Sequence, residues 1–115
     1  MLDVNRELEN SLQNLSCALV YRQPSGFNAL PVVSYYNITE SASFSADNEE
    51  QMIDGVIQLD VWAKLPSQCG EIALEINGLL TEDGWVRQFS MDVPKQSKER
   101  AYHKTLRYTK TFLNR

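Results

Sequence analysis

Apolar and polar residues alternate most regularly in the stretch from Pro31 to Lys64. In its second half one face carries Ile57, Leu59, Val61 and Ala63, and the other carries Gln58, Asp60 and Trp62. A period of two residues is typical of a strand with one buried face. The first half, 32–39, is rich in β-branched and aromatic residues and follows a proline, which also favours a strand. The stretch therefore predicts two strands joined as a hairpin.

The connection within this hairpin, from Glu40 to Gln51, has about a dozen residues where two to five are typical. Loops of this length are often functional or disordered, so we interpret it as a surface presented to a partner. A cation could bind the carboxylates of Asp47, Glu49, Glu50 and Asp54. The spacing is not that of a calcium loop, however, and no glycine stands at the sixth position. A solvated acidic loop, or a contact with a basic surface on another chain, is therefore the favoured reading.

Two segments show helical spacing instead. The first runs from Asp3, a possible N-cap, to about Ser16, with one apolar stripe formed by Val4, Leu8, Leu12 and Leu15. The second begins at Pro66 and ends in a turn at Gly84, with a stripe formed by Cys69, Ile72, Ala73, Ile76, Leu79 and Leu80. Both segments are expected to pack on the sheet as amphipathic helices.

Three further runs alternate like strands. The first is Cys17–Arg22, followed by a turn-rich stretch at 23–29. The second is Trp85–Val93, in which we expect one face to carry Trp85, Phe89, Met91 and Val93. The third places Tyr102, Leu106, Tyr108 and Phe112 on one face with Lys104 and Lys110. The order of elements predicts an α+β fold: one domain over residues 1–115, in two layers, with a mainly antiparallel sheet and two flanking helices.

The formal net charge of −4 hides an uneven distribution. Residues 95–115 contain seven basic residues and one acidic residue, whereas residues 1–94 contain four basic and fourteen acidic ones. Such asymmetry indicates complementary surfaces, although a solvated basic strand without a partner would give the same pattern. No apolar run approaches the roughly 18 residues that span a bilayer, and the N-terminus does not resemble a signal peptide, so we expect no membrane contact and synthesis in the cytoplasm.

Few residues could carry chemistry. Cys17 and Cys69 lack metal-ligand spacing and are expected to be small buried residues, with a disulfide left open. His103, the one histidine, lies opposite an apolar face without a recognisable nucleophile, and we interpret it as a surface residue. Binding of nucleic acid by the C-terminal basic residues with Tyr102 and Tyr108 ranks below a core role for these tyrosines. We expect no catalytic residues, no cofactor, no metal and no enzymatic activity.

The string PVVSYYNITE, the ADNEE loop and the strand ending in IQLDVWAK resemble the tail-completion proteins of long-tailed bacteriophages and prophages, which include tail terminator and tail-to-head joining proteins. The later order of elements also fits, so the resemblance covers most of the chain. It implies a structural virion protein with an α+β domain that forms a hexameric ring at the head-proximal end of the tail tube. There it would end tube polymerisation and meet the head connector or stopper protein.

The resemblance also implies partners and a place in the particle. They are further copies of the chain, the major tail tube protein and the head connector, in a virion assembled after synthesis in the host cytoplasm. DNA would pass through the ring without specific binding, and acidic loops lining the channel would repel its phosphates. Two alternatives stay open: another head–tail joining or minor tail component, and a non-catalytic host adaptor protein.

The ring and the charge distribution together suggest an interface. In a ring each subunit shows different surfaces to its two neighbours, which suits a chain that is acidic in one place and basic in another. We therefore expect an acidic group to lie near a basic group of the next subunit, or to face another ring partner. The acidic group is Glu40, Asp47, Glu49 and Glu50, and the basic group is Lys95, Lys98 and Arg100.

Overall fold

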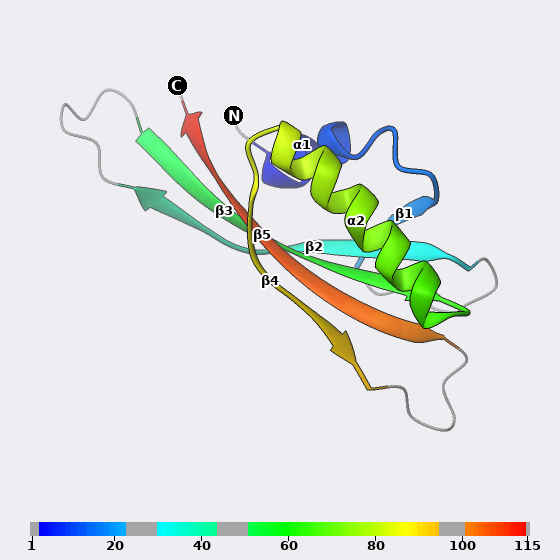
Figure 1. Ribbon diagram of the computed structural model, residues 1–115. Helices are drawn as coiled ribbons and strands as arrows, with labels where there is room; N and C mark the ends of the chain where they lie inside the picture. Colours follow the sequence, from blue (N-terminus) through cyan, green and yellow to red (C-terminus); the bar gives the residue numbers. More distant parts are fainter. Residues whose placement is uncertain (1–2, 23–29, 44–50, 95–100, 115) are drawn as a thin grey trace.

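The computed structural model describes residues 3–22, 30–43, 51–94 and 101–114. Along the chain these form α1 (Val4–Ser11), β1 (Ala18–Tyr21), β2 (Val32–Ser43), β3 (Gln51–Ala63), α2 (Pro66–Glu82), β4 (Val86–Val93) and β5 (Tyr102–Asn114) (Figure 1). The strands form one sheet in the order β1-β2-β3-β5-β4. β1 is parallel to β2, and all other neighbours are antiparallel. The predicted α+β fold with a mainly antiparallel sheet and two helices is confirmed.

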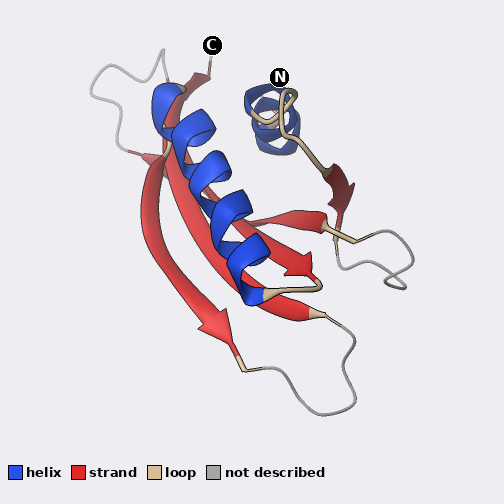
Figure 2. Ribbon diagram, turned by 45° about the vertical axis from the view of Figure 1, so that its right-hand side comes forward, coloured by secondary structure: helices blue, strands red, loops and turns tan. Residues whose placement is uncertain are grey.

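Both helices cover the same face of the sheet, as Figure 2 shows. α1 lies against β2, and α2 lies along β3 and β5. The main core fills the space between these layers, and its fully buried side chains include Val4, Leu8, Val33, Ile57, Leu59, Val61, Ile76, Leu80 and Tyr108. The predicted buried face of β3, from Ile57 to Ala63, is therefore confirmed.

α1 begins where the sequence predicts and ends earlier. The Asp3 side chain accepts a hydrogen bond from Arg6 N at 3.3 Å, which makes it the N-cap. The helix stops at Ser11 instead of continuing to about Ser16, and Leu12 is its C-cap. The Ser11 hydroxyl donates back to the Glu7 carbonyl, a local bond that competes with helix propagation. Leu15 still packs against the core, although it lies in a turn after the helix, in which Leu15 N donates to the Leu12 carbonyl.

α2 agrees with its predicted limits. Pro66 stands in the first turn, where its missing N–H costs no helical hydrogen bond. The buried residues are Cys69, Ile72, Ala73, Ile76 and Leu80, nearly the predicted stripe. Gly84 follows the helix with φ +90°, a conformation that glycine adopts without strain.

The hairpin of β2 and β3 is longer than predicted, and its loop is shorter. Glu40 pairs with Gly55, and pairing continues outward to Ser43 with Met52. The prediction that the loop begins at Glu40 is therefore wrong: cross-strand pairing with 52–55 holds residues 40–43 as strand. Residues 44–50 lie outside the described part of the chain.

The predicted core face of β4 is also wrong. Arg87 pairs with Tyr108 on the helix side of the sheet, but the register shifts after it, and Phe89 pairs with Arg107 on the other side. A bulge of one residue reverses the direction of every later side chain. Trp85 therefore lies in the main core, whereas Met91 is 52% exposed on the opposite face.

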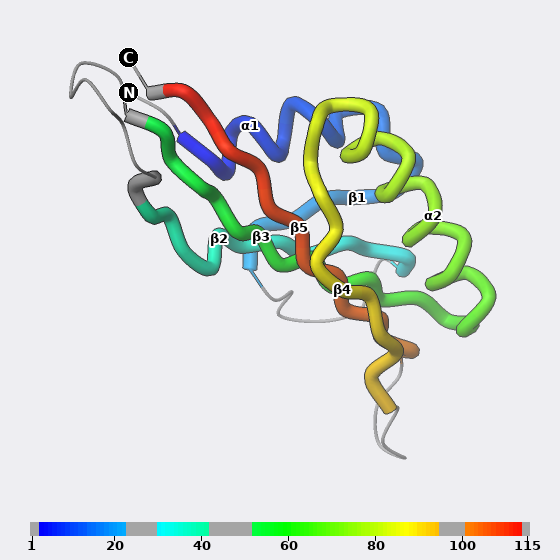
Figure 3. Tube along the Cα trace, turned by 60° about the vertical axis from the view of Figure 1, so that its left-hand side comes forward, coloured from blue at the N-terminus to red at the C-terminus, as the bar shows by residue number. Residues whose placement is uncertain are grey.

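The molecule is elongated, with principal extents of 54 × 24 × 21 Å. Its radius of gyration is 15.3 Å, whereas a compact domain of this length has about 13 Å. The excess comes from the far ends of β2 and β3, which project beyond the two helices (Figures 1 and 3). We call the three-stranded part formed by Thr39–Ser43, 52–56 and 109–113 the arm.

Candidate subunit interface

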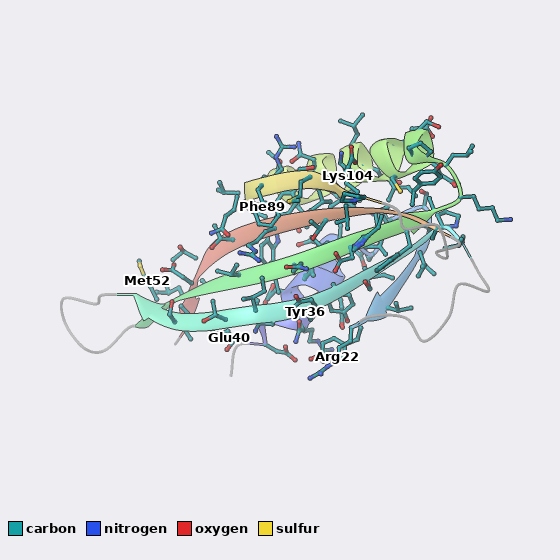
Figure 4. All side chains as sticks on the ribbon, turned by 90° about the horizontal axis from the view of Figure 1, so that it is seen from below. Arg22, Tyr36, Glu40, Met52, Phe89 and Lys104 are labelled. Carbon is teal, nitrogen blue, oxygen red and sulfur yellow. The ribbon has the colours of Figure 1, made fainter. Side chains whose placement is uncertain are left out.

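Glu40 is the one predicted interface residue inside the described part of the chain. It is exposed on the arm, and its carboxylate accepts a hydrogen bond from Asn37 Nδ2. Figure 4 shows it with Tyr36 along the outer edge of β2. The other predicted interface residues (Asp47, Glu49, Glu50, Lys95, Lys98 and Arg100) lie outside the described residues.

The segments that contain those residues start from opposite ends of the sheet. Ser43 and Gln51, which flank the acidic segment, lie where Met52 pairs with Leu113. Val93 and Tyr102, which flank the basic segment, lie at the other end of the same strands. The strand ends that lead into the two charged segments are thus separated along the length of the sheet.

Glu40 and Lys110 carry opposite charges on opposite edges of the arm. Both pair with Gly55, Glu40 from β2 and Lys110 from β5, so the three residues form one row across the sheet. Lys110 Nζ donates to the Asp83 carbonyl at 2.6 Å and lies 5.2 Å from the centre of the Phe112 ring. These contacts hold the ammonium group near its own edge of the sheet.

Both edges of the arm lack a strand partner within the described residues. β1 pairs with β2 only from Val32 to Tyr35, and β4 pairs with β5 only as far as Thr109. The outer backbone of β2 after Tyr36 and of β5 after Thr109 is therefore open in the described part of the chain. Unpaired edges of this kind are templates for pairing with another strand.

Exposed apolar side chains lie on and beside the arm. Met52 and Leu113 form a cross-strand pair and are 44% and 43% exposed. Val86, where β4 begins, is 62% exposed, and Ile38 is 37% exposed at the bulge in β2. A hollow of about 560 Å³ also lies where β1 ends, lined by Tyr21, Arg22, Tyr36 and Asn37.

The face of the sheet away from the helices carries a polar network around His103. Its ring stacks on Trp62 with 3.7 Å between ring centres, and its Nε2 lies 2.6 Å from Asp60 Oδ1. Trp62 Nε1 donates to Ser34 Oγ at 3.2 Å. The His103 side chain is 16% exposed. It lies opposite the helix-covered face as predicted, but these contacts leave it partly buried and not a freely exposed surface histidine. Trp62, expected on a polar face, is 6% exposed and forms a second apolar cluster with Val32 and Ala101.

Burial raises the pKa values of several ionisable groups. Burial raises the pKa of the Tyr108 hydroxyl, which donates to Asn77 Oδ1 and so links β5 to α2. Burial, followed by a hydrogen bond to Glu9, raises the pKa of Tyr35. Both cysteines are free thiols, and burial raises the pKa of each, which lowers the thiolate fraction on which cysteine reactivity depends.

Replacing His103 by alanine should lower the free energy of unfolding by about 2 kcal/mol, a value between those of exposed and buried ion pairs. The change leaves Asp60, which is 8% exposed, without its histidine, and it removes the ring stacked on Trp62. Urea unfolding measures the effect. Lys104→Ala is the matched control: its partner Asp92 is 83% exposed, so we expect a loss of at most about 0.5 kcal/mol. Equal losses for the two variants would contradict the structural role of His103.

Within residues 3–22, 30–43, 51–94 and 101–114, neither helix has the length and apolar character that crossing a membrane requires. In the same ranges, no three His, Cys, Asp or Glu side chains are grouped so that they could hold a metal ion.

Comparison with known proteins adds a structural likeness. No family model matches the sequence, and no curated protein matches it. A chain in a solved structure described as the virion of a native gene transfer agent (GTA) particle has a similar fold, with a TM-score of 0.64 and 13% sequence identity. The alignment covers 93% of this chain and 84% of that chain. The chain thus shares its fold, over nearly its whole length, with a protein chain found in that particle.

Proposed function

We propose that this chain is a structural protein of a phage-like virion. The observation that carries the proposal is the fold shared with a chain of the GTA virion over 93% of this chain. The resemblance of PVVSYYNITE, ADNEE and IQLDVWAK to tail-completion proteins points the same way. Within that class we propose that copies form a hexameric ring at the head-proximal end of the tail tube, end tube polymerisation and join the tail to the head connector.

The distribution of charge and of open strand edges favours an assembly in which unlike surfaces of neighbouring copies meet. The strand ends that lead to the acidic and basic segments lie at opposite ends of the sheet. The two edges of the arm also differ in sequence and charge. Surfaces that differ in this way produce heterologous contacts, and heterologous contacts close into rings when the rotation between copies permits.

The role needs no catalytic centre. His103, the one histidine, is held between Asp60 and Trp62, and the two thiols have raised pKa values. We propose that these groups stabilise the domain. The partners in this role are the neighbouring copies, the tail tube protein and the head connector, with DNA passing through the ring without specific binding.

Deletion of the gene in a strain that produces the particles tests the role. We expect tails of uncontrolled length that are not attached to heads, as seen by electron microscopy, and restoration by the wild-type gene supplied in trans. A labelled copy should appear where tail and head meet. Normal tails joined to heads in the deletion strain would contradict the proposal. A label elsewhere along the tail would favour a minor tail component, and absence from purified particles would favour a host adaptor.

A further inference from the structure

We propose that neighbouring copies join by strand addition, with residues 40–43 of β2 in one copy pairing with residues 110–113 of β5 in the next. The sheets would then run on from copy to copy through the arms. This inference rests on the proposed ring, because it specifies the surface by which the ring closes.

The two edges match in extent. In β2 the register shift between Asn37 and Thr39 interrupts the regular pairing with β3, so the regular outer edge of the arm begins at Thr39 and reaches Ser43. In β5 the edge becomes open after Thr109, where pairing with β4 ends, and reaches Asn114. Each edge thus offers five consecutive residues of strand, enough for a short β-augmentation in which main-chain hydrogen bonds supply much of the affinity.

The strand directions favour a ring over a twofold dimer. β2 and β5 are both antiparallel to β3, so they run in the same direction. Copies related by rotation about a ring axis can therefore bring β5 of one beside β2 of the next as a parallel pair. A twofold dimer would instead pair β2 with β2, and would leave both β5 edges open.

The charges favour this pairing over pairing of like edges. Glu40 and Lys110 occupy the same row of the sheet, one on each edge. Joining unlike edges in register brings Glu40 of one copy near Lys110 of the next. Joining two β2 edges would bring two carboxylates together, which is unfavourable.

Apolar side chains border the same contact. An added strand beside residues 110–114 continues the line of β4, which begins at Val86 opposite Thr109. The added strand would then meet the beginning of β4 at Val86, whose side chain is 62% exposed in the single copy. The open edge of β2 also lacks proline and carries only one charged residue, Glu40, so it has few of the devices that normally prevent strand addition.

Mixing two charge-reversed variants tests the inference. Glu40→Lys alone brings two ammonium groups together at each contact between copies, and Lys110→Glu alone brings two carboxylates together. Each should therefore reduce the amount of protein in purified particles by about tenfold. Produced together in the deletion strain, the two variants can alternate around the ring. Half of the contacts then keep the original pair of charges, and the other half carry the same pair with the two charges exchanged.

The arrangement of the mixture decides what recovery to expect. Each variant presents the same sign of charge on both of its edges, so an alternating ring places an ammonium group opposite a carboxylate at every contact. We therefore expect the mixture to recover at least half of the wild-type incorporation. Glu71→Lys, which changes an exposed residue on α2, is the control and should incorporate normally.

Thermal unfolding of each variant shows whether it folds, since Lys110→Glu also removes the hydrogen bond to the Asp83 carbonyl. Normal incorporation of both single variants, or failure of two folded variants to recover when mixed, would overturn the inference.

Amide hydrogen exchange on wild-type protein gives an independent measure. The amides within residues 40–43 and 110–113 that point away from β3 should exchange at least about tenfold more slowly in the assembled ring than in the single copy, because pairing protects amides from opening. Unchanged exchange would overturn strand addition.

The outcomes separate this inference from the proposed function. A ring at the tail end whose arm amides exchange as in the single copy keeps the function and refutes strand addition. Absence of the protein from particles refutes the function. In that case, chemical cross-linking of the concentrated pure protein tests strand addition. Failure to form oligomers larger than a dimer would refute it.

Discussion

Replacing Trp85 by alanine should lower the free energy of unfolding by about 3–5 kcal/mol, the usual cost of removing a large buried aromatic side chain. Trp85 is 2% exposed and meets Phe112 edge to face with 5.5 Å between ring centres. Its Nε1 donates to Ser11 Oγ at 3.1 Å. The side chain therefore joins the turn after α2 to the end of α1 and to β5, and its loss leaves a cavity that these three elements share.

Urea unfolding followed by circular dichroism measures this effect, and an unchanged slope would show that the denatured state is not altered. Leu74→Ala is the control, because Leu74 is 73% exposed on α2 and its truncation should change stability by at most about 0.5 kcal/mol. Trp85→Phe should fall between the two, since it keeps an aromatic ring but leaves the Ser11 hydroxyl without its donor. A loss for Trp85→Ala no larger than that for Leu74→Ala would show that this junction is not part of the stabilising core.

Replacing Gly55 by alanine should cost about 1–3 kcal/mol through overpacking. A Cβ atom at Gly55 would lie 2.7 Å from Val4 Cγ1 and 3.1 Å from Val4 Cγ2, closer than carbon atoms pack. Valine has a stiff side chain, so the strain must move α1 away from the sheet. Val4, the first residue of α1, thus occupies the space that a side chain at Gly55 would need.

Two controls isolate the cause. Gly70→Ala, in α2 with nothing within 4 Å of the added carbon, should raise stability by up to about 1 kcal/mol because alanine favours helix. Val4→Ala combined with Gly55→Ala removes the clash, so the double variant should be more stable than the sum of the two single effects predicts. Additive losses would mean that contact with Val4 is not the reason for glycine at this position.

The proposed ring and the proposed strand addition use features that a single copy leaves unsatisfied. The edges of the arm that are open within the described residues lie toward one end of the molecule, together with the exposed side chains of Met52, Leu113 and Val86. A single copy would gain from covering them, because unpaired edges with apolar borders favour association. Assembly into a ring satisfies these groups without any change in the fold.

The sequence by itself determined the order of elements, the fold class, the N-cap at Asp3, the extent of α2 and the buried face of β3. These features depend on local chemistry: the period of apolar residues, a capping carboxylate, and proline and glycine at the ends of a helix. Each is encoded within a few neighbouring residues, so it can be recognised before any contact is known.

Tertiary structure alone decided the length of the hairpin, the face of β4, the setting of His103 and the row that joins Glu40 to Lys110. Residues 40–43 are strand because β3 pairs with them, and Phe89 changes face because of a bulge defined only by its partner in β5. His103 is held by Asp60 and Trp62, which lie far earlier in the chain on a neighbouring strand. Pairing between distant segments has no local signature, because register is set by the whole sheet.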